Sequence, residues 1–235
     1  MTNIFWFFFL GLLPSFLWLV FYYKKDPRPE PKRMVLIFFL YGIIISLPVA
    51  LLENAITFSL GSPETFSLFK IFLYYFFVVA LIEELFKYWV FRFGIMRNPE
   101  FDEPTDALVY IIAVALGFAA VENILIIFPS TVQLFLKDAI IIIAYRSVSA
   151  TILHALASAN IGFFFALSLF RTHKRKLYLF FGCTLSIFLH TLYNFATALE
   201  AETGIFVILL VVSLLFVVVL WEFAKLNKLK SVCKI

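Results

Sequence analysis

Long apolar stretches separated by short polar loops run through the whole chain, and they restrict the fold more than any other feature. Of the 235 residues, 63% are hydrophobic and only 14% are charged. The mean hydropathy is +1.01. A helix that crosses a bilayer needs about 20 apolar residues, so about seven such spans would use nearly all of those available. The sequence therefore predicts an all-α, polytopic membrane bundle of about seven helices.

The apolar stretches also set the expected boundaries of the spans. We expect spans over residues 4–23, 34–55, 69–97, 106–128, 147–170, 177–198 and 205–223. The segment 130–146 is left open, because its apolar part, DAIIIIAY, is too short to cross and could be an outer re-entrant or interfacial piece. Residues 1–235 are expected to form one membrane domain, in which residues 69–198 carry the polar motifs.

Basic residues cluster in alternate loops, which is the pattern that sets the orientation of membrane helices. KKDPRPEPKR (24–33), RTHKRK (171–176) and the lysine-rich tail after residue 223 are expected to be cytoplasmic. The loops TFSLGSPETFS (57–67) and EAETG (200–204) contain no basic residue and are expected outside. This places the N-terminus outside and the C-terminus in the cytoplasm. Because the basic clusters lie between apolar runs, the net charge of +4 indicates membrane orientation and not nucleic-acid binding.

One charged stretch, ALIEELFK (80–87), lies inside an apolar run. It carries two adjacent carboxylates, Glu83 and Glu84, and the ammonium of Lys87. Each charge near a bilayer centre costs several kcal/mol, so such residues need partners or a function. Glu83 and Lys87 have the favourable spacing for an ion pair on one helix face, so a purely structural clamp is an alternative to catalysis.

Polar residues also occur within three later spans, where they and small residues follow the three- or four-residue spacing that places side chains on one helix face. Small residues share these faces, so the polar side chains are expected to point into the bundle and not into lipid. Each one alone could be a hydrogen-bonded packing residue. The expected convergence of several polar side chains on one space is what favours a functional site. The catalytic candidates are Glu83, Glu84, Glu122, His154, His190 and Asn194, with Lys87, Asn123, Arg146 and Ser158 in support.

Four segments resemble, in order, the PrsW family of membrane proteases, which belongs with the CAAX prenyl endopeptidase and bacteriocin-processing superfamily. They are EELFK (83–87), DEPTDALVYIIAVALGFAAVEN (102–123), HALASANIG (154–162) and HTLYNF (190–195). Together they span about half of the chain and are specific as a set. Ala107 stands where many relatives have glycine. This difference does not change any of the polar residues.

The resemblance implies an intramembrane endopeptidase of a prokaryotic cytoplasmic membrane. Its expected partners are the lipid bilayer and a membrane-protein or peptide substrate, such as a single-span anti-sigma factor cut outside the membrane at site 1. The superfamily is expected to work without a metal cofactor. An ion-coupled transporter or a non-catalytic scaffold is the alternative from another class, because transporters also bury carboxylates and histidines.

The expected chemistry is attack on a peptide carbonyl by a water molecule that a glutamate activates. His190 and Asn194 would stabilise the oxyanion, and Glu122 or His154 would hold the water or protonate the leaving amine. The base stays open: spacing ties Glu83 to Lys87 and leaves Glu84 freer, whereas related prenyl endopeptidases use the first glutamate. Zinc held by Glu122, His154 and His190 is the alternative mechanism.

Overall fold

The computed structural model describes residues 2–26, 28–96, 98–128 and 135–229, and within these ranges all regular structure is helical. The α-helices are α1 (Thr2–Tyr23), α2 (Lys32–Leu60), α3 (Leu68–Tyr74), α4 (Leu81–Ile95), α5 (Pro104–Ile127), α6 (Leu136–Val148), α7 (Ala150–Phe170), α8 (Arg175–Ala196) and α9 (Ala201–Leu226). Two short 3-10 turns, η1 (Pro63–Thr65) and η3 (Thr172–Lys174), and one π-helical turn, η2 (Tyr75–Ala80), complete the set. The predicted all-α bundle is confirmed.

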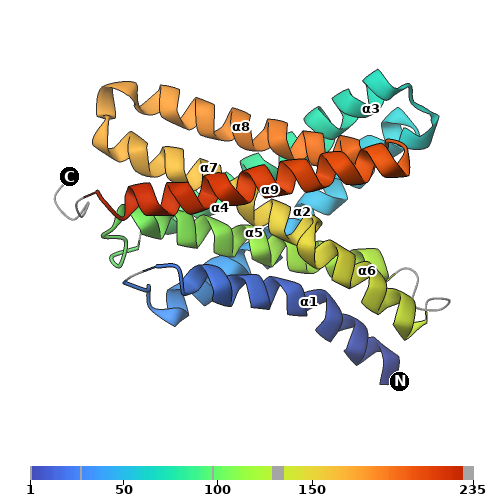
Figure 1. Cartoon of the computed structure of the whole chain (residues 1–235), viewed down its shortest axis with the longest axis horizontal. Coiled ribbons are helices and arrows are strands. Elements are labelled where there is room, and N and C mark those ends of the chain that lie inside the picture. The colour runs from blue at the N-terminus through green and yellow to red at the C-terminus, as the bar shows by residue number, and fades with distance from the viewer. Residues whose placement is uncertain (1, 27, 97, 129–134, 230–235) are drawn as a thin grey trace.

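The loops sort onto the two ends of the bundle in the way that their charges predict (Figure 1). The basic α1–α2 and α7–α8 connections lie at the same end as the last turn of α9. The α2–α3 and α8–α9 connections lie at the opposite end, where α1 begins. Which of these ends faces the cytoplasm stays a prediction from the charge pattern.

Among the described residues, six helical stretches are long and apolar enough to cross a membrane. They are Phe5–Tyr23, Lys32–Leu60, Pro104–Ile127, Leu136–Phe170, Thr172–Ala196 and Ala201–Leu226. The path from α3 through η2 to α4 also runs from one end of the bundle to the other (Figure 1). This path is not one of the six stretches. It carries the EELFK stretch, whose charged side chains are buried inside the bundle and do not face lipid.

The predicted helix 69–97 consists of three consecutive helical segments, α3, η2 and α4. The last described helical residue is Ile95, and Arg97, the expected end of the helix, lies outside the described residues. A π-helical turn such as η2 is rare and frequently occurs at functional sites. Here it directly precedes the turn of α4 that carries Glu83 and Glu84.

The open segment 130–146 is helical from Leu136 onward, and its first residues lie outside the described ranges. α6 leads into α7 with a single break at Ser149, where φ is −123° and ψ is −87°. α6 packs beside α1. The segment is therefore a continuation of span five and not a separate piece, and it brings Arg146 close to the start of α7.

α5 is the central helix, and it packs against α1, α2 and α7. It is buried along almost its whole length. At the crossing with α2, a Cβ on Gly117 would overlap the backbone oxygen of Phe39, and one on Gly42 would overlap that of Val114. Only glycine permits this approach of the two backbones, which fixes the position of the end of α5 that carries Glu122.

Candidate active site

The charged stretch of α4 lies fully inside the bundle, with Lys87 at its centre. Its Nζ atom lies 2.9 Å from Glu83 Oε2, 2.8 Å from Glu84 Oε1 and 2.9 Å from His154 Nδ1. These three acceptors use all three N–H groups of the ammonium. The ring of Phe118 lies 4.3 Å from Nζ and covers the remaining side. The predicted pair of Glu83 and Lys87 is therefore confirmed as part of a larger network.

Glu84 is held by four donors and has no contact with solvent. Its Oε1 accepts from Lys87 and lies 3.0 Å from His190 Nδ1. Its Oε2 accepts hydrogen bonds from Ser158 Oγ at 2.7 Å and Ser186 Oγ at 3.0 Å. Each oxygen of this carboxylate thus has two partners, so its main effect is to fix the surrounding helices and the His190 ring.

Glu83 has a different environment, although it is also buried. Its Oε2 contacts Lys87 and lies 3.6 Å from His154 Nδ1 and 4.0 Å from His190 Nε2. Within the described part of the chain, its Oε1 has no hydrogen-bond partner. A cavity of about 50 Å³ lies beside it, lined by Ser46, Ala50, Glu53, Glu83, Phe118, Glu122 and Leu125. A cavity of this size and polarity has room for water.

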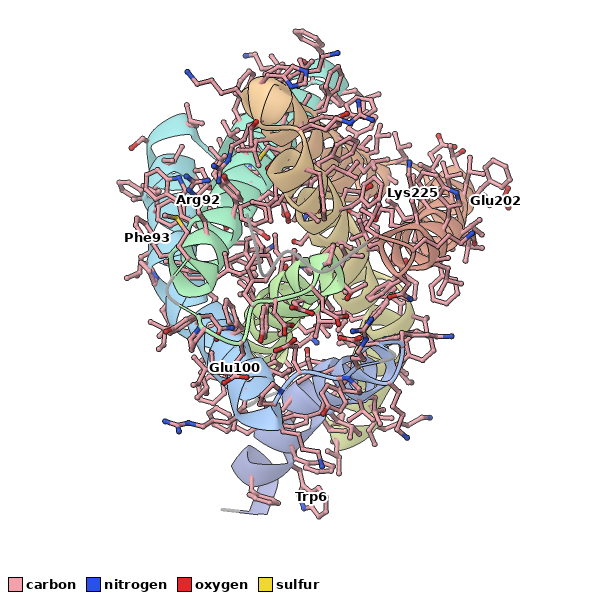
Figure 2. All side chains as sticks on the ribbon, turned by 90° about the vertical axis from the view of Figure 1, so that its left-hand side faces the viewer. Trp6, Arg92, Phe93, Glu100, Glu202 and Lys225 are labelled. Atoms are coloured by element: carbon pink, nitrogen blue, oxygen red, sulfur yellow. The ribbon has the colours of Figure 1, made fainter. Side chains whose placement is uncertain are left out.

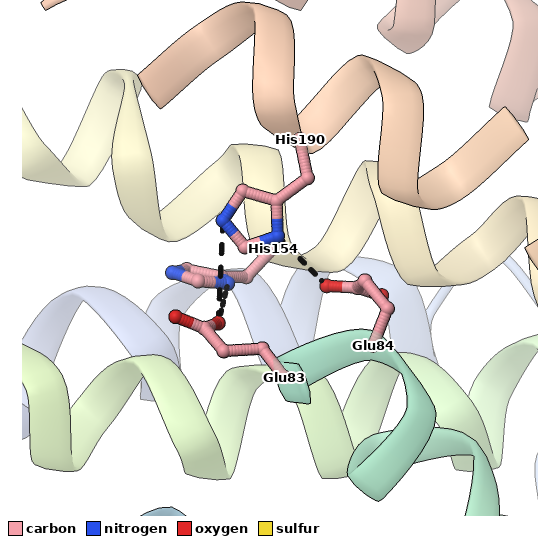
Figure 3. Close-up of side chains that lie close together, drawn as sticks. All are labelled: Glu83, Glu84, His154 and His190. Atoms are coloured by element: carbon pink, nitrogen blue, oxygen red, sulfur yellow. Dashed lines mark hydrogen bonds and ion pairs between the residues drawn. The ribbon is translucent and has the colours of Figure 1, made fainter. Parts of the chain in front are cut away.

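The two histidines reach the carboxylates from α7 and α8, as Figure 3 shows, with ring centroids 4.9 Å apart and nearly perpendicular planes. His154 Nε2 lies 2.7 Å from Glu122 Oε2 and donates its hydrogen there, which leaves Nδ1 to accept from Lys87. His190 Nδ1 donates to Glu84, which leaves its Nε2 on the side of Glu83.

Glu122 is supported by the residues predicted to assist the site. Arg146 NH2 lies 3.1 Å from Glu122 Oε2, and Arg146 Nε donates to Asn123 Oδ1 at 2.7 Å. Asn123 Nδ2 in turn donates to Thr151 Oγ1 at 3.0 Å. The chain of contacts joins α5, α6 and α7 and holds Glu122 against His154.

The structure brings together every predicted site residue except Asn194. Asn194 lies one turn beyond His190 on α8 and is half-buried, and its side chain makes no hydrogen bond to the network within the described residues. Sequence reasoning did not name Ser186 and Glu53 as site residues. Ser186 shares the helix face of His190, and Glu53 is an acidic residue inside a span, which is itself a signal of function.

The residues that could hold a metal ion differ from the predicted zinc set. Within the described residues, Glu83, Glu84, His154 and His190 place ligand atoms within 4.8 Å of one another, whereas Glu122 belongs to neither such group. Two carboxylates and two imidazoles have the chemistry of a zinc site. The Lys87 ammonium, however, already binds three of the four residues. As they are arranged, these residues do not fit a divalent cation, because it would lie against that fixed positive charge.

Comparisons with known proteins identify the family of this chain. Residues 30–221 match the model of the family described as "PrsW family intramembrane metalloprotease". Protease PrsW of Geobacillus kaustophilus is 31% identical over 94% of this chain and 89% of its own length. Protease PrsW of Oceanobacillus iheyensis is 31% identical over 79% of the chain and 80% of its length. The Bacillus subtilis protein of that name is 27% identical over 94% of both chains. No solved structure matches.

These relatives cover 79% to 94% of the chain, and the family match includes all of the buried polar network. The relatives are bacterial, and the apolar helices make the chain an integral, multi-pass protein of the cytoplasmic membrane. The chain therefore belongs to the PrsW family of intramembrane proteases and is a peptidase.

Proposed function

We propose that the protein is an endopeptidase in which Glu83 activates a water molecule for attack on a peptide bond of a membrane protein. The observation that carries this proposal is the contrast within the glutamate pair. Glu84 has two partners on each oxygen, whereas Glu83 has one oxygen without a partner beside a cavity that can hold water. A general base must reach the proton that it removes, and only Glu83 of the pair does.

The reaction follows from these positions. Glu83 takes a proton from the water as the water oxygen bonds to the carbonyl carbon, and the carbonyl oxygen becomes an oxyanion. The protonated Glu83 then gives its proton to the amide nitrogen, the C–N bond breaks, and a carboxylic acid and an amine leave. Lys87 keeps Glu83 in place throughout and offsets the buried negative charge.

Two histidines support the charged intermediate. His190 carries its Nε2 on the side of Glu83, and the contact of its Nδ1 with Glu84 holds the ring in place. Donation from Nε2 would stabilise the oxyanion, and Asn194 would add a second donor once substrate is bound. Glu122 lines the same cavity and would orient the water, and His154 holds Glu122 in place.

We infer that the substrate is a single-span membrane protein, such as an anti-sigma factor, cut near the outer surface at site 1. Glu122 lies only five residues before Ile127, the end of α5, and His190 lies six residues before Ala196, the end of α8. At about 1.5 Å per residue, the site is therefore within about 10 Å of the end opposite the basic loops. That end is the outer one by the charge pattern.

A cleavage assay with purified protein and a single-span substrate in liposomes tests the proposal. Replacing Glu83 by Gln removes the base while keeping the shape, so cleavage should fall by about 10²-fold or more. Asp138→Asn, on the exposed side of α6, is the matched control and should cut normally. Full activity of the Glu83→Gln variant would show that the base lies elsewhere. Absence of cleavage by the unaltered protein across a panel of single-span substrates would favour the transporter or scaffold alternative.

A further inference from the structure

An acidic residue of α2, Glu53, lies inside an apolar span, and no step of the proposed reaction uses it. It lines the cavity of about 50 Å³ that Glu83 and Glu122 also line. It follows Lys32, where α2 begins, by 21 residues, or about 32 Å. Glu53 therefore lies far from the end of the bundle that faces the viewer in Figure 2, where Glu100 is labelled.

The end of α2 that carries Glu53 is fixed to α3 one turn further along. Thr57 Oγ1 donates to the backbone oxygen of Glu53 at 2.7 Å and also lies 2.7 Å from the hydroxyl oxygen of Tyr74 on α3. Because the single hydroxyl hydrogen of Thr57 is used within α2, Tyr74 is the donor between the two helices. α3 leads through η2 into the turn that carries Glu83. These contacts therefore hold Glu53 and Glu83 on two sides of one cavity.

The Glu53 carboxyl group has no cation of its own. Its Oε1 is buried, and within the described residues it has neither a hydrogen-bond partner nor a salt bridge. Lys87 already binds Glu83. Arg146 already pairs with Glu122. An ionised Glu53 would add an unpaired charge beside two other carboxylates in a poorly solvated space, which is strongly unfavourable. This arrangement favours the neutral, protonated form of Glu53.

A water molecule in this cavity also needs a hydrogen-bond donor, and its polar surroundings consist mainly of acceptors. Among the described lining residues, Ser46 carries the only hydroxyl group, and it donates to the backbone oxygen of Ile43 at 2.7 Å. The ionised carboxylates of Glu83 and Glu122 can only accept. A protonated Glu53 supplies the missing donor.

We propose that Glu53 is a further catalytic residue, whose neutral carboxyl group donates a hydrogen bond to the water molecule that Glu83 activates. This role rests on the function proposed for Glu83. The water then directs its hydrogens at Glu83 and Glu122 and one lone pair at Glu53, which leaves its other lone pair for the peptide carbonyl carbon. The O–H bond that breaks belongs to the water, and its proton goes to Glu83. Glu53 keeps its own proton and orients the nucleophile.

Two substitutions at position 53 distinguish this role from that of a base. Glu53→Gln keeps a neutral hydrogen-bond donor of similar shape and should cleave a single-span substrate in liposomes at close to the unaltered rate. Glu53→Leu removes the donor and should lower kcat by about 10-fold or more with little change in KM. Glu100→Gln and Glu100→Leu, at the exposed residue labelled in Figure 2, are the matched controls and should cut normally.

Thermal unfolding and the Glu83→Gln variant distinguish the possible outcomes. Glu53→Leu removes an acidic group from a membrane span, so its Tm should not fall. Normal cleavage by Glu53→Leu, with Glu83→Gln inactive, would overturn the role of Glu53 and leave that of Glu83 intact. Equal losses in Glu53→Gln and Glu53→Leu would also overturn it, because they would show that an ionised carboxylate is needed. Normal cleavage by Glu83→Gln would overturn the proposed function and, with it, this role.

Infrared spectroscopy tests the proton on Glu53 without any measurement of activity. The C=O stretch of a protonated carboxyl group lies at a higher frequency than the bands of a carboxylate. At neutral pH, this band should lose intensity in Glu53→Gln and stay unchanged in Glu100→Gln. A band of the same intensity in Glu53→Gln as in the unaltered protein would show that Glu53 is ionised and would overturn the proposal.

Discussion

Glu83 and Glu84 are neighbours on α4, yet their surroundings give them different contributions to the protein. Glu84 accepts hydrogen bonds from Lys87, Ser158 and Ser186 and contacts His190, so it joins three helices. Glu83 keeps one oxygen for the cavity. Loss of the Glu84 charge should mainly affect stability, and loss of the Glu83 charge should mainly affect the reaction.

Single Gln substitutions therefore have separable effects. Glu83→Gln should abolish cleavage and leave Tm close to that of the unaltered protein, because only one of its oxygens has a partner. Glu84→Gln should lower stability by about 3 kcal/mol or more, because four buried groups lose the charged acceptor that they contact. Thermal unfolding and substrate cleavage, measured on the same preparations, check both outcomes. Equal losses of stability in the two variants would contradict the distinction.

Removal of zinc tests the proposed mechanism of the active site. A zinc-selective chelator such as 1,10-phenanthroline, applied while Mg²⁺ is kept present, should leave cleavage intact, because the Lys87 ammonium lies among the donor atoms. Metal analysis of the treated protein confirms that zinc is removed. Loss of activity that zinc restores would show instead that Glu83, Glu84, His154 and His190 act as ligands after Lys87 moves.

Much of this site can be predicted from the sequence, because few charged residues lie within the spans and because residues four apart share one face of a helix. The pairing of Glu83 with Lys87 follows from their separation by four residues. The expectation that Glu84 is the freer of the pair is wrong, because Lys87 also reaches it at a separation of three and serines from two distant helices bind it. Such contacts depend on how the helices pack against one another, and the spacing of residues along one helix does not predict that packing.

The crossing of α2 and α5 is the closest helix contact that the glycines reveal. Gly117→Ala should destabilise the protein by about 2 kcal/mol or more, since its Cβ would overlap backbone and not a side chain that can move. Activity should fall with it, because Glu122 lies at the end of the displaced helix. Unfolding in detergent measures the effect, and Val217→Ala on the exposed face of α9 is the control. An unchanged Tm for Gly117→Ala would show that the helices can separate freely.

The helices themselves are predicted with boundaries close to those observed, because apolar length and charged loops determine them. Two features escape such prediction. The π-helical turn η2 has no distinguishing residue type, and the joining of α6 to α7 depends on a single backbone break at Ser149. Both arise from packing against neighbouring helices and not from local preference.

The charges of the loops predict how the whole protein is oriented in the membrane. A reporter placed within residues 24–33, or after Ile235, should be cytoplasmic, and one within residues 200–204 should be outside. The sorting of these loops onto opposite ends of the bundle supports the alternation (Figure 1). Reporter activity in intact cells measures it directly. An extracytoplasmic C-terminus would reverse the orientation and would place the active site near the inner surface.

The π-helical turn η2 also bears on how this protein tolerates changes in its length. Removing one residue from a regular helix rotates everything beyond it by about 100°, which would turn the glutamate pair away from the histidines. A π-helical turn contains one residue more than an α-helical turn needs, so it can absorb such a deletion by becoming α-helical. Deleting the exposed Phe77 should therefore preserve cleavage, whereas deleting Phe86 on α4 should abolish it. By the same logic, homologues that differ by a single residue in this helix can keep the same catalytic register.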